Sequence, residues 1–213
     1  MSEVRSFTVG PVQENCHFVW ANGSDRCVVI DPGDEAPKLL AALEDLGLGC
    51  DAILLTHTHF DHVGAVAPLA RETGAEVWCP EIERPVLADI MSFVPWPGFG
   101  PFESYEADHL IRGGEKLELA GLEFDVVFTP GHSPGHVTFV TDGGETLLAG
   151  DVLFQGSVGR TDLPGGDWPT LARSIASLLE AYPDSAAVHT GHGPSTTLGV
   201  ERRTNPFLVD LVS

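Results

Sequence analysis

Three histidines and one aspartate fall within six residues of this chain, in the segment His57-Thr58-His59-Phe60-Asp61-His62. A hydrophobic core does not need three imidazoles and a carboxylate together, because burying polar groups costs free energy unless each is paired. The same side chains are suitable ligands for zinc, iron or manganese. In an extended segment, residues two apart share a face, so His57 and His59 can reach one ion. The segment therefore predicts a metal site.

Three more potential ligands lie far downstream, and a glycine precedes each of them. They are His132, Asp151 and His192. Glycine lets the backbone approach a crowded site closely, because it carries no side chain. Asp61 and His62 stand where the first segment is predicted to enter a helix, which can turn them toward a second ion. We expect the fold to bring all these residues together.

The remaining histidines carry weaker signals. His136 shares the segment 129–136 with His132, and we assign it a supporting or structural role beside the site. A lone histidine is more often structural than metal-binding, so His17, His109 and His189 are left unassigned.

Short apolar runs between turn residues predict strands, and apolar residues at helical spacing predict helices. Strands are predicted over residues 27–31, 51–56, 75–79, 117–119, 122–128, 137–141, 146–149 and 186–190. Helices are predicted over 36–46, 62–73, 81–90 and 168–181, and Pro68 would kink or break the second of them. Residues 91–102 read as an irregular loop, either overhanging a pocket or forming a plain surface insertion. These elements predict an α/β chain with two β-sheets and outer helices in one domain, residues 1–213.

The amino-acid composition indicates in which cellular compartment the protein is expected. With 213 residues and 43% hydrophobic content, the chain can bury a core without disulfides. Its four cysteines are scattered, which favours buried thiols in a reducing compartment over disulfides. The first ten residues lack the apolar run of a signal peptide, and no run approaches the ~20 apolar residues of a membrane span. We therefore expect a cytoplasmic protein.

The net charge of the chain indicates which classes of binding partner are not expected. The formal net charge is -20, from 31 acidic and 11 basic residues. Such a surface repels phosphate backbones and anionic lipids, so neither nucleic acid nor a membrane is an expected partner. Self-association is left open by the same surface.

The H-x-H-x-D-H block and the three downstream ligands, in this order, resemble the metallo-β-lactamase superfamily. The resemblance covers residues 7–206 and implies an α/β fold of the αββα sandwich type, with two metal ions at one edge of the sheets. Carried over residue by residue, the first ion is held by His57, His59 and His132, the second by Asp61, His62 and His192, and both by Asp151.

Within that superfamily, segments 129–136, 150–154 and 156–162 look like those of short glyoxalase II-like hydrolases. This likeness implies hydrolysis of a small-molecule thioester such as S-lactoylglutathione, by a metal-bound hydroxide that Asp61 orients and Asp151 helps to hold. Two divalent ions are implied, zinc first, with iron or manganese as alternatives. Arg160 falls where the family has a basic, thiol-binding residue. Asp162 replaces an aromatic partner, and the family's C-terminal helical domain is missing, so glutathione is not required as the thiol.

Two other interpretations stay open. A persulfide dioxygenase shares the fold and would use His57, His132 and Asp151 as a two-histidine, one-carboxylate iron site. The segment 156–166 is more similar to the short hydrolases. A binding or regulatory module without catalysis is the second alternative, and the complete ligand set argues against it.

Overall fold

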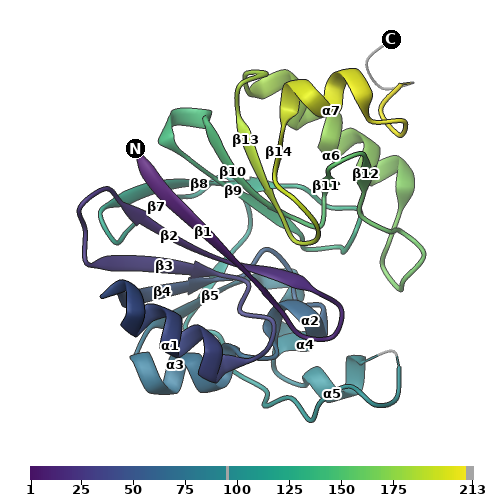
Figure 1. Cartoon of the computed structure of the whole chain (residues 1–213). Coiled ribbons are helices and arrows are strands. Elements are labelled where there is room, and N and C mark those ends of the chain that lie inside the picture. The colour runs from purple at the N-terminus through teal and green to yellow at the C-terminus, as the bar shows by residue number, and fades with distance from the viewer. Residues whose placement is uncertain (95, 210–213) are drawn as a thin grey trace.

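The computed structural model describes residues 1–94 and 96–209, which form two six-stranded sheets packed face to face with helices on both outer faces (Figure 1). The first sheet has the order β1-β2-β3-β4-β5-β6 and the second the order β14-β13-β10-β9-β8-β7. Helices α1 and α3 cover the first sheet, whereas α6 and α7 lie on the side of the second. The predicted α/β fold of the αββα type is confirmed.

The strands of the two large sheets account for most of the elements. The first sheet contains β1 (Ser2–Val9), β2 (Glu14–Ala21), β3 (Arg26–Ile30), β4 (Gly49–Leu54), β5 (Glu76–Pro80) and β6 (His109–Ile111). The second contains β7 (Lys116–Leu119), β8 (Leu122–Phe128), β9 (Val137–Thr141), β10 (Thr146–Gly150), β13 (Ala187–Thr190) and β14 (Thr196–Thr197). A small hairpin joins β11 (Leu153–Phe154) to β12 (Ser157–Val158).

Helices fill the connections. They are α1 (Ala36–Leu46), α2 (Phe60–Val63), α3 (Val66–Thr73), α4 (Arg84–Leu87), α5 (Ile90–Phe93), α6 (Trp168–Ala181) and α7 (Leu198–Thr204), with 3₁₀ turns η1 (Glu81–Glu83) and η2 (Asp142–Gly144). None of the helices in the described residues is both long enough and apolar enough to cross a membrane.

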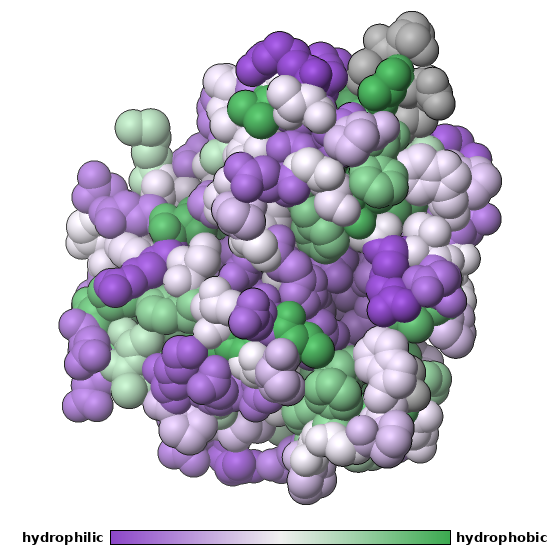
Figure 2. Space-filling view, turned by 45° about the vertical axis from the view of Figure 1, so that its right-hand side comes forward, coloured by the Kyte–Doolittle hydropathy of each residue, from purple (hydrophilic) through white to green (hydrophobic). Residues whose placement is uncertain are grey.

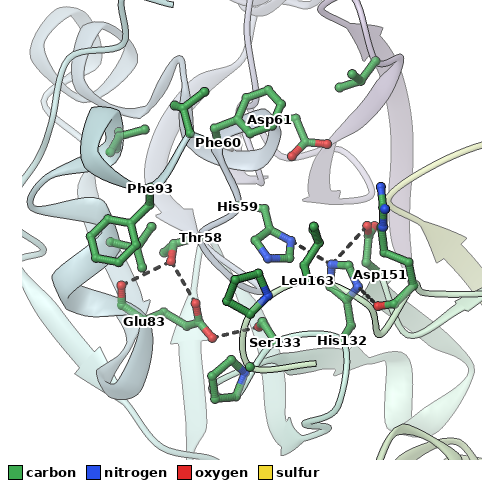
Figure 3. A pocket seen from close by; sticks show the side chains of 18 of the residues that line it. Thr58, His59, Phe60, Asp61, Glu83, Phe93, His132, Ser133, Asp151 and Leu163 are labelled. Carbon is green, nitrogen blue, oxygen red and sulfur yellow. Dashed lines mark hydrogen bonds and ion pairs between the residues drawn. The ribbon is translucent and has the colours of Figure 1, made fainter. Parts of the chain in front are cut away.

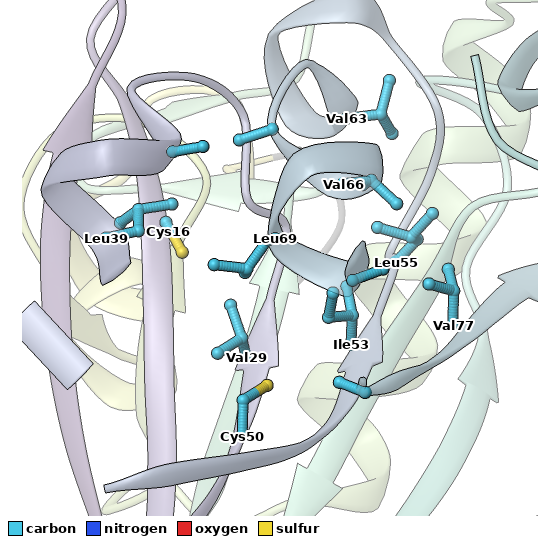
Figure 4. Packing of buried hydrophobic residues seen from close by; sticks show 14 of the residues in the cluster. Cys16, Val29, Leu39, Cys50, Ile53, Leu55, Val63, Val66, Leu69 and Val77 are labelled. Atoms are coloured by element: carbon cyan, nitrogen blue, oxygen red, sulfur yellow. The ribbon is translucent and has the colours of Figure 1, made fainter. Parts of the chain in front are cut away.

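Each central strand of the first sheet packs against helices on one side and against the second sheet on the other, because successive side chains point to opposite faces of a sheet. On β3 and β4, Val29 and Ile53 pack under α1 and α3, where Leu69 meets them (Figure 4). Their neighbours Val28 and Leu54 face the second sheet instead. Burial on both faces favours an unbroken apolar run, and residues 27–30 of β3 and 52–54 of β4 form such runs.

Several predictions of elements need correction. Residues 62–73 do not form one helix, because the chain divides into α2 and α3 around Gly64 and Ala65. Pro68 does not cause that break: it is the third residue of α3, where its missing N–H would have no intrahelical partner. Residues 81–90 form three short pieces instead of one helix.

The four cysteines are free and buried, as predicted. The loop 91–102 begins within α5, and its residues 92–94 and 96 line a cavity, which confirms the overhanging alternative. Pro95 of that loop lies outside the described residues.

Candidate metal centre

Four connections that follow strand ends carry the predicted site residues. The His57–His62 segment comes after β4, His132 after β8, Asp151 directly after β10 and His192 after β13. β4 is parallel to its neighbours β3 and β5, and β10 is parallel to β13, so these ends meet at one edge of the sandwich. The structure thus brings all seven predicted ligands to one place, while their roles as ligands stay a prediction.

Three imidazoles form the first group. His59 Nδ1 lies 3.2 Å from His57 Nε2 and 2.8 Å from His132 Nε2. Burial lowers the pKa of His57 well below its usual range and that of His59 to about 4, and the nearby histidines act in the same direction. Neutral imidazoles keep a free lone pair, so these three nitrogens can share one metal ion.

A second group lies beside the first. His192 Nε2 is 3.3 Å from Asp61 Oδ2, and His62 Nε2 is 4.0 Å from the same oxygen. Burial alone would lower the pKa of His62, but Asp151, Asp31 and Asp61 outweigh it and raise the pKa well above its usual range. One carboxylate and two imidazoles within reach of one another are a second set that can hold a divalent ion.

Asp151 lies between the two groups. Its Oδ1 is 3.4 Å from His62 Nε2, and its Oδ2 is 3.5 Å from His132 Nε2 and 3.7 Å from His192 Nε2. Burial opposes its charge, yet the surrounding histidines outweigh burial and hold the pKa of the carboxyl below its usual range. An ionised carboxylate in this position can face both groups at once.

Unpartnered buried atoms support a metal at this place. Asp151 Oδ1 and His62 Nε2 are buried, and neither makes a hydrogen bond to any described residue. Leaving such atoms without a partner in a protein interior is costly. Because both face the same spot as the other ligand atoms, a divalent cation fits the donors that the chain presents.

The outward nitrogens of the histidines are also held. His132 Nδ1 donates to the Arg160 backbone carbonyl at 2.8 Å, which leaves Nε2 as the free acceptor. His62 Nδ1 lies 3.0 Å from Asp31 Oδ2, and His57 Nδ1 lies 3.0 Å from Thr56 Oγ1. Such contacts fix the tautomer and orientation of metal-binding imidazoles.

His136 supports the site from behind, as predicted. Its Nε2 accepts a hydrogen bond from the Asp151 backbone N–H at 3.1 Å. The glycine expectation is confirmed too: a Cβ on Gly150 would lie 2.4 Å from Thr56 Oγ1, and one on Gly191 would lie 2.1 Å from Asp151 Oδ1. Neither position has room for a side chain.

Buried carboxylates beside the site were missed by sequence reasoning. Glu14 Oε1 lies 3.7 Å from His62 Nδ1, and burial raises the pKa of Glu14 well above its usual range. Asp31 enters the sequence analysis only as the last residue of a predicted strand, 27–31. Its place between an apolar strand and a proline-glycine turn was the available signal, whereas nothing in the sequence marks Glu14.

Glu83 is the third missed carboxylate, and it joins two ligand loops (Figure 3). Its Oε2 accepts from Thr58 Oγ1 at 2.9 Å, and its Oε1 accepts from Ser133 Oγ at 2.8 Å and from the Gly135 N–H at 2.7 Å. Thr58 stands between two of the histidines, and Ser133 directly follows His132. Glu83 therefore fixes both loops relative to each other.

Replacing Glu83 by alanine is expected to weaken metal binding by about 10- to 100-fold, the range for residues that orient ligands. Glu83→Gln should lose less, because its amide oxygen can still accept from Ser133 and Gly135. Affinity is measured by titration against a chromophoric chelator. Glu81→Ala, whose carboxylate pairs with Arg112 at the surface, is the control. Wild-type affinity in a folded Glu83→Ala would contradict the role.

A cavity of about 810 Å³ opens over the metal centre, and its walls are mostly apolar. The space-filling view shows a recess with hydrophilic residues on its floor and hydrophobic ones around it (Figure 2). Arg160 lines this cavity, but its guanidinium donates to both Asp162 oxygens, at 2.7 and 2.8 Å, and lies 5.7 Å from the Trp96 ring centroid. Its predicted role in substrate binding stays a prediction.

The chain is similar to known proteins in sequence and in fold. The family model described as the metallo-beta-lactamase superfamily matches residues 9–192. Hydroxyacylglutathione hydrolase GloC of Haemophilus influenzae is 38% identical over 198 residues, covering 92% of this chain and 93% of the relative. Among solved structures, BLEG-1 B3 metallo-beta-lactamase is 38% identical with a TM-score of 0.91, covering 97% of this chain and all of that one.

A second solved structure bears on the metal. The crystal structure of TTHA1623 in a di-iron-bound form is 46% identical with a TM-score of 0.84, and the match covers 96% of this chain and all of that one. The family match spans most of the chain, and these similarities extend over nearly its whole length. The chain therefore belongs to the metallo-beta-lactamase superfamily of metallo-hydrolases.

Proposed function

We propose that this chain is a binuclear metallo-hydrolase that cleaves a thioester, with S-lactoylglutathione as the first compound to test. The observation that carries the proposal is the pair of three-residue ligand groups on either side of Asp151, at the floor of an open cavity. The similarity to a hydroxyacylglutathione hydrolase over nearly the whole chain supports the choice of substrate.

The chemistry of the site suits this reaction. Two divalent ions, when bound, supply a water whose pKa is lowered to about 7 and positive charge for the oxygen of an attacked carbonyl. Asp61 and His192, 3.3 Å apart, stand at the cavity and would fix the direction of the attacking water. Burial works against the charge of Asp61, but His192 and His62 keep the pKa of that carboxyl low. The Asp61 carboxylate is thus charged at neutral pH and can accept a hydrogen bond from the attacking water.

The leaving group also favours a thioester. A thiol has an unperturbed pKa of about 8.5, so it leaves as thiolate with little protonation. An amide or lactam nitrogen is far more basic and needs a proton in order to leave. Among the described residues that line the cavity, the acidic and basic groups outside the ligand set are Glu83, which is hydrogen-bonded to three donors, and Arg160, which is ion-paired. Neither is placed as a free general acid.

The second ligand group argues against a one-iron persulfide dioxygenase. Such an enzyme needs only a two-histidine, one-carboxylate set with open positions. Here Asp61, His62 and His192 form a further set, and His62 Nε2 is buried without a hydrogen bond to the described residues. A second ion would take that nitrogen as a ligand, whereas with one ion its nearest polar partner is Asp151 Oδ1, 3.4 Å away.

The test is elemental analysis of protein purified without a chelating tag, with S-lactoylglutathione hydrolysis measured on the same sample. About two divalent ions per chain and steady turnover are expected, and His59→Gln should remove turnover. His109→Gln, a surface histidine paired with Glu76, should behave like wild type. One iron per chain with oxygen uptake on glutathione persulfide would overturn the proposal, as would β-lactam hydrolysis without thioester cleavage.

A further inference from the structure

We infer that the acyl group of the substrate is apolar and of medium length, and that it lies in the cavity between α4–α5 and the loop at Leu163. The inference rests on the proposed thioesterase function and adds the substrate class. It departs from a short hydroxyacyl group such as lactoyl, which would leave most of the space empty.

The size and walls of the cavity carry this inference. Cavities of about 300–1,000 Å³ hold drug-sized ligands, and this one measures about 810 Å³. Beside the metal centre, the wall is formed by Val86, Ile90, Phe93, Val94 and Leu163. Figure 3 shows Phe93 and Leu163 around His59, so a carbonyl held at the ligand groups directs one of its substituents among these side chains.

The apolar side chains at the mouth are open to solvent. Ile82 is 55% exposed, Phe93 is 53% exposed and Trp96 is 41% exposed. Exposed apolar surface that gathers in a concave site marks a ligand-binding surface, because its removal from water stabilises a complex. An alkyl or aryl group would cover these three side chains.

The charges of the wall exclude a charged acyl group. Arg160 is the single lysine or arginine among the described lining residues, and Asp162 neutralises it through two hydrogen bonds. The carboxylate of Glu83 is buried and already accepts three hydrogen bonds. An acyl carboxylate against the α4–α5 wall, away from the ligand groups, would lose water without gaining a free lysine or arginine, which is costly.

The acyl side of the thioester is therefore assigned to the cavity, and the thiol side to the solvent. Common thiol carriers are polar and charged, so they gain nothing from an apolar wall, whereas an alkyl chain gains with every methylene that it buries. With the thioester carbonyl at the ligand groups on the cavity floor, the acyl chain lies along the apolar wall that includes Val86, Phe93 and Val94, and the carrier extends into the solvent.

The test uses S-acyl-N-acetylcysteamine thioesters with one small uncharged thiol and different acyl groups, assayed on the metal-loaded protein. From acetyl to butanoyl, hexanoyl and octanoyl, kcat/KM is expected to rise about fourfold per methylene until the cavity is filled. Butanoyl should exceed succinyl, which has the same number of carbons but a carboxylate in place of the terminal methyl group, by at least about tenfold.

Two matched variants test whether the dependence of kcat/KM on acyl chain length arises in this cavity. Phe93→Ser should lower the octanoyl-to-acetyl ratio of kcat/KM by about fivefold, because half of that ring is exposed before the chain binds. Phe207→Ser removes a ring of similar exposure, 49%, that does not line the cavity, and should leave the ratio unchanged. Both positions are exposed, so both variants are expected to fold.

The outcomes separate the two proposals. Hydrolysis without dependence on chain length, or with lactoyl or succinyl preferred, overturns the apolar acyl group and leaves the thioesterase standing. A chain-length dependence that Phe93→Ser does not change overturns the assignment to this cavity. Failure to hydrolyse any thioester, including S-lactoylglutathione, overturns the proposed function itself.

Discussion

Replacing Asp151 by asparagine is expected to lower kcat/KM for thioester hydrolysis by more than about 100-fold, since residues that merely orient ligands already cost about 10- to 100-fold. Asp151 faces both ligand groups, through Oδ1 toward His62 and through Oδ2 toward His132 and His192. An asparagine of the same shape removes the charge that those imidazoles stabilise, and it turns an N–H₂ group toward at least one ligand nitrogen. The loss should therefore appear in metal content as well as in rate.

The measurements are steady-state kinetics and metal content of the purified variant. Asp184→Asn is the matched control, because Asp184 is half-exposed, forms a surface ion pair with Arg202 and belongs to neither ligand group. It should retain wild-type rate and metal content. If Asp151→Asn kept two ions and the wild-type rate, the carboxylate would not bridge the groups.

The sequence predicted most strands of the two large sheets, including β7 and β8 with their alternating polar residues, and missed β1, β2, β6 and β14. β3, β4 and β10 are runs of apolar side chains, so their pattern was readable. β2 is almost entirely buried as well, but it contains Glu14, Asn15 and His17, which hid it. Its polar groups are buried because Asn15 and His17 bond to the Thr190 carbonyl of the other sheet, a contact that no local pattern reveals.

The candidate site was more predictable than the strands around it. Metal ligation draws on few residue types, so the density of histidine in residues 57–62 stood out against the background. Glu83 and Glu14 had no such contrast in a chain with 31 acidic residues. Their importance comes from burial and from partners distant in sequence, and both depend on how the two sheets pack.

Removing the metal is expected to lower the melting temperature by about 8–16 °C. A ligand that binds only the native state at about 1,000 times its Kd stabilises that state by about 4.1 kcal/mol. For a chain of this size, each kcal/mol corresponds to about 2–4 °C in Tm. The donors that depend on the ion are buried: His57 and His62 are 0% exposed, and Asp151 is 7% exposed.

Without the ion, those donors stay in the interior with too few partners. Asp151 Oδ1 and His62 Nε2 have no hydrogen bond to the described residues, and Asp151 shares the region with the buried Glu14. Scanning calorimetry of the loaded protein, of the same protein after dialysis against a chelator, and after readdition of zinc or iron measures the shift. Recovery of Tm on readdition would separate metal loss from irreversible damage. An equal Tm before and after removal would mean that the buried ligands are satisfied without a metal, and the site would then have to be reinterpreted as a polar core.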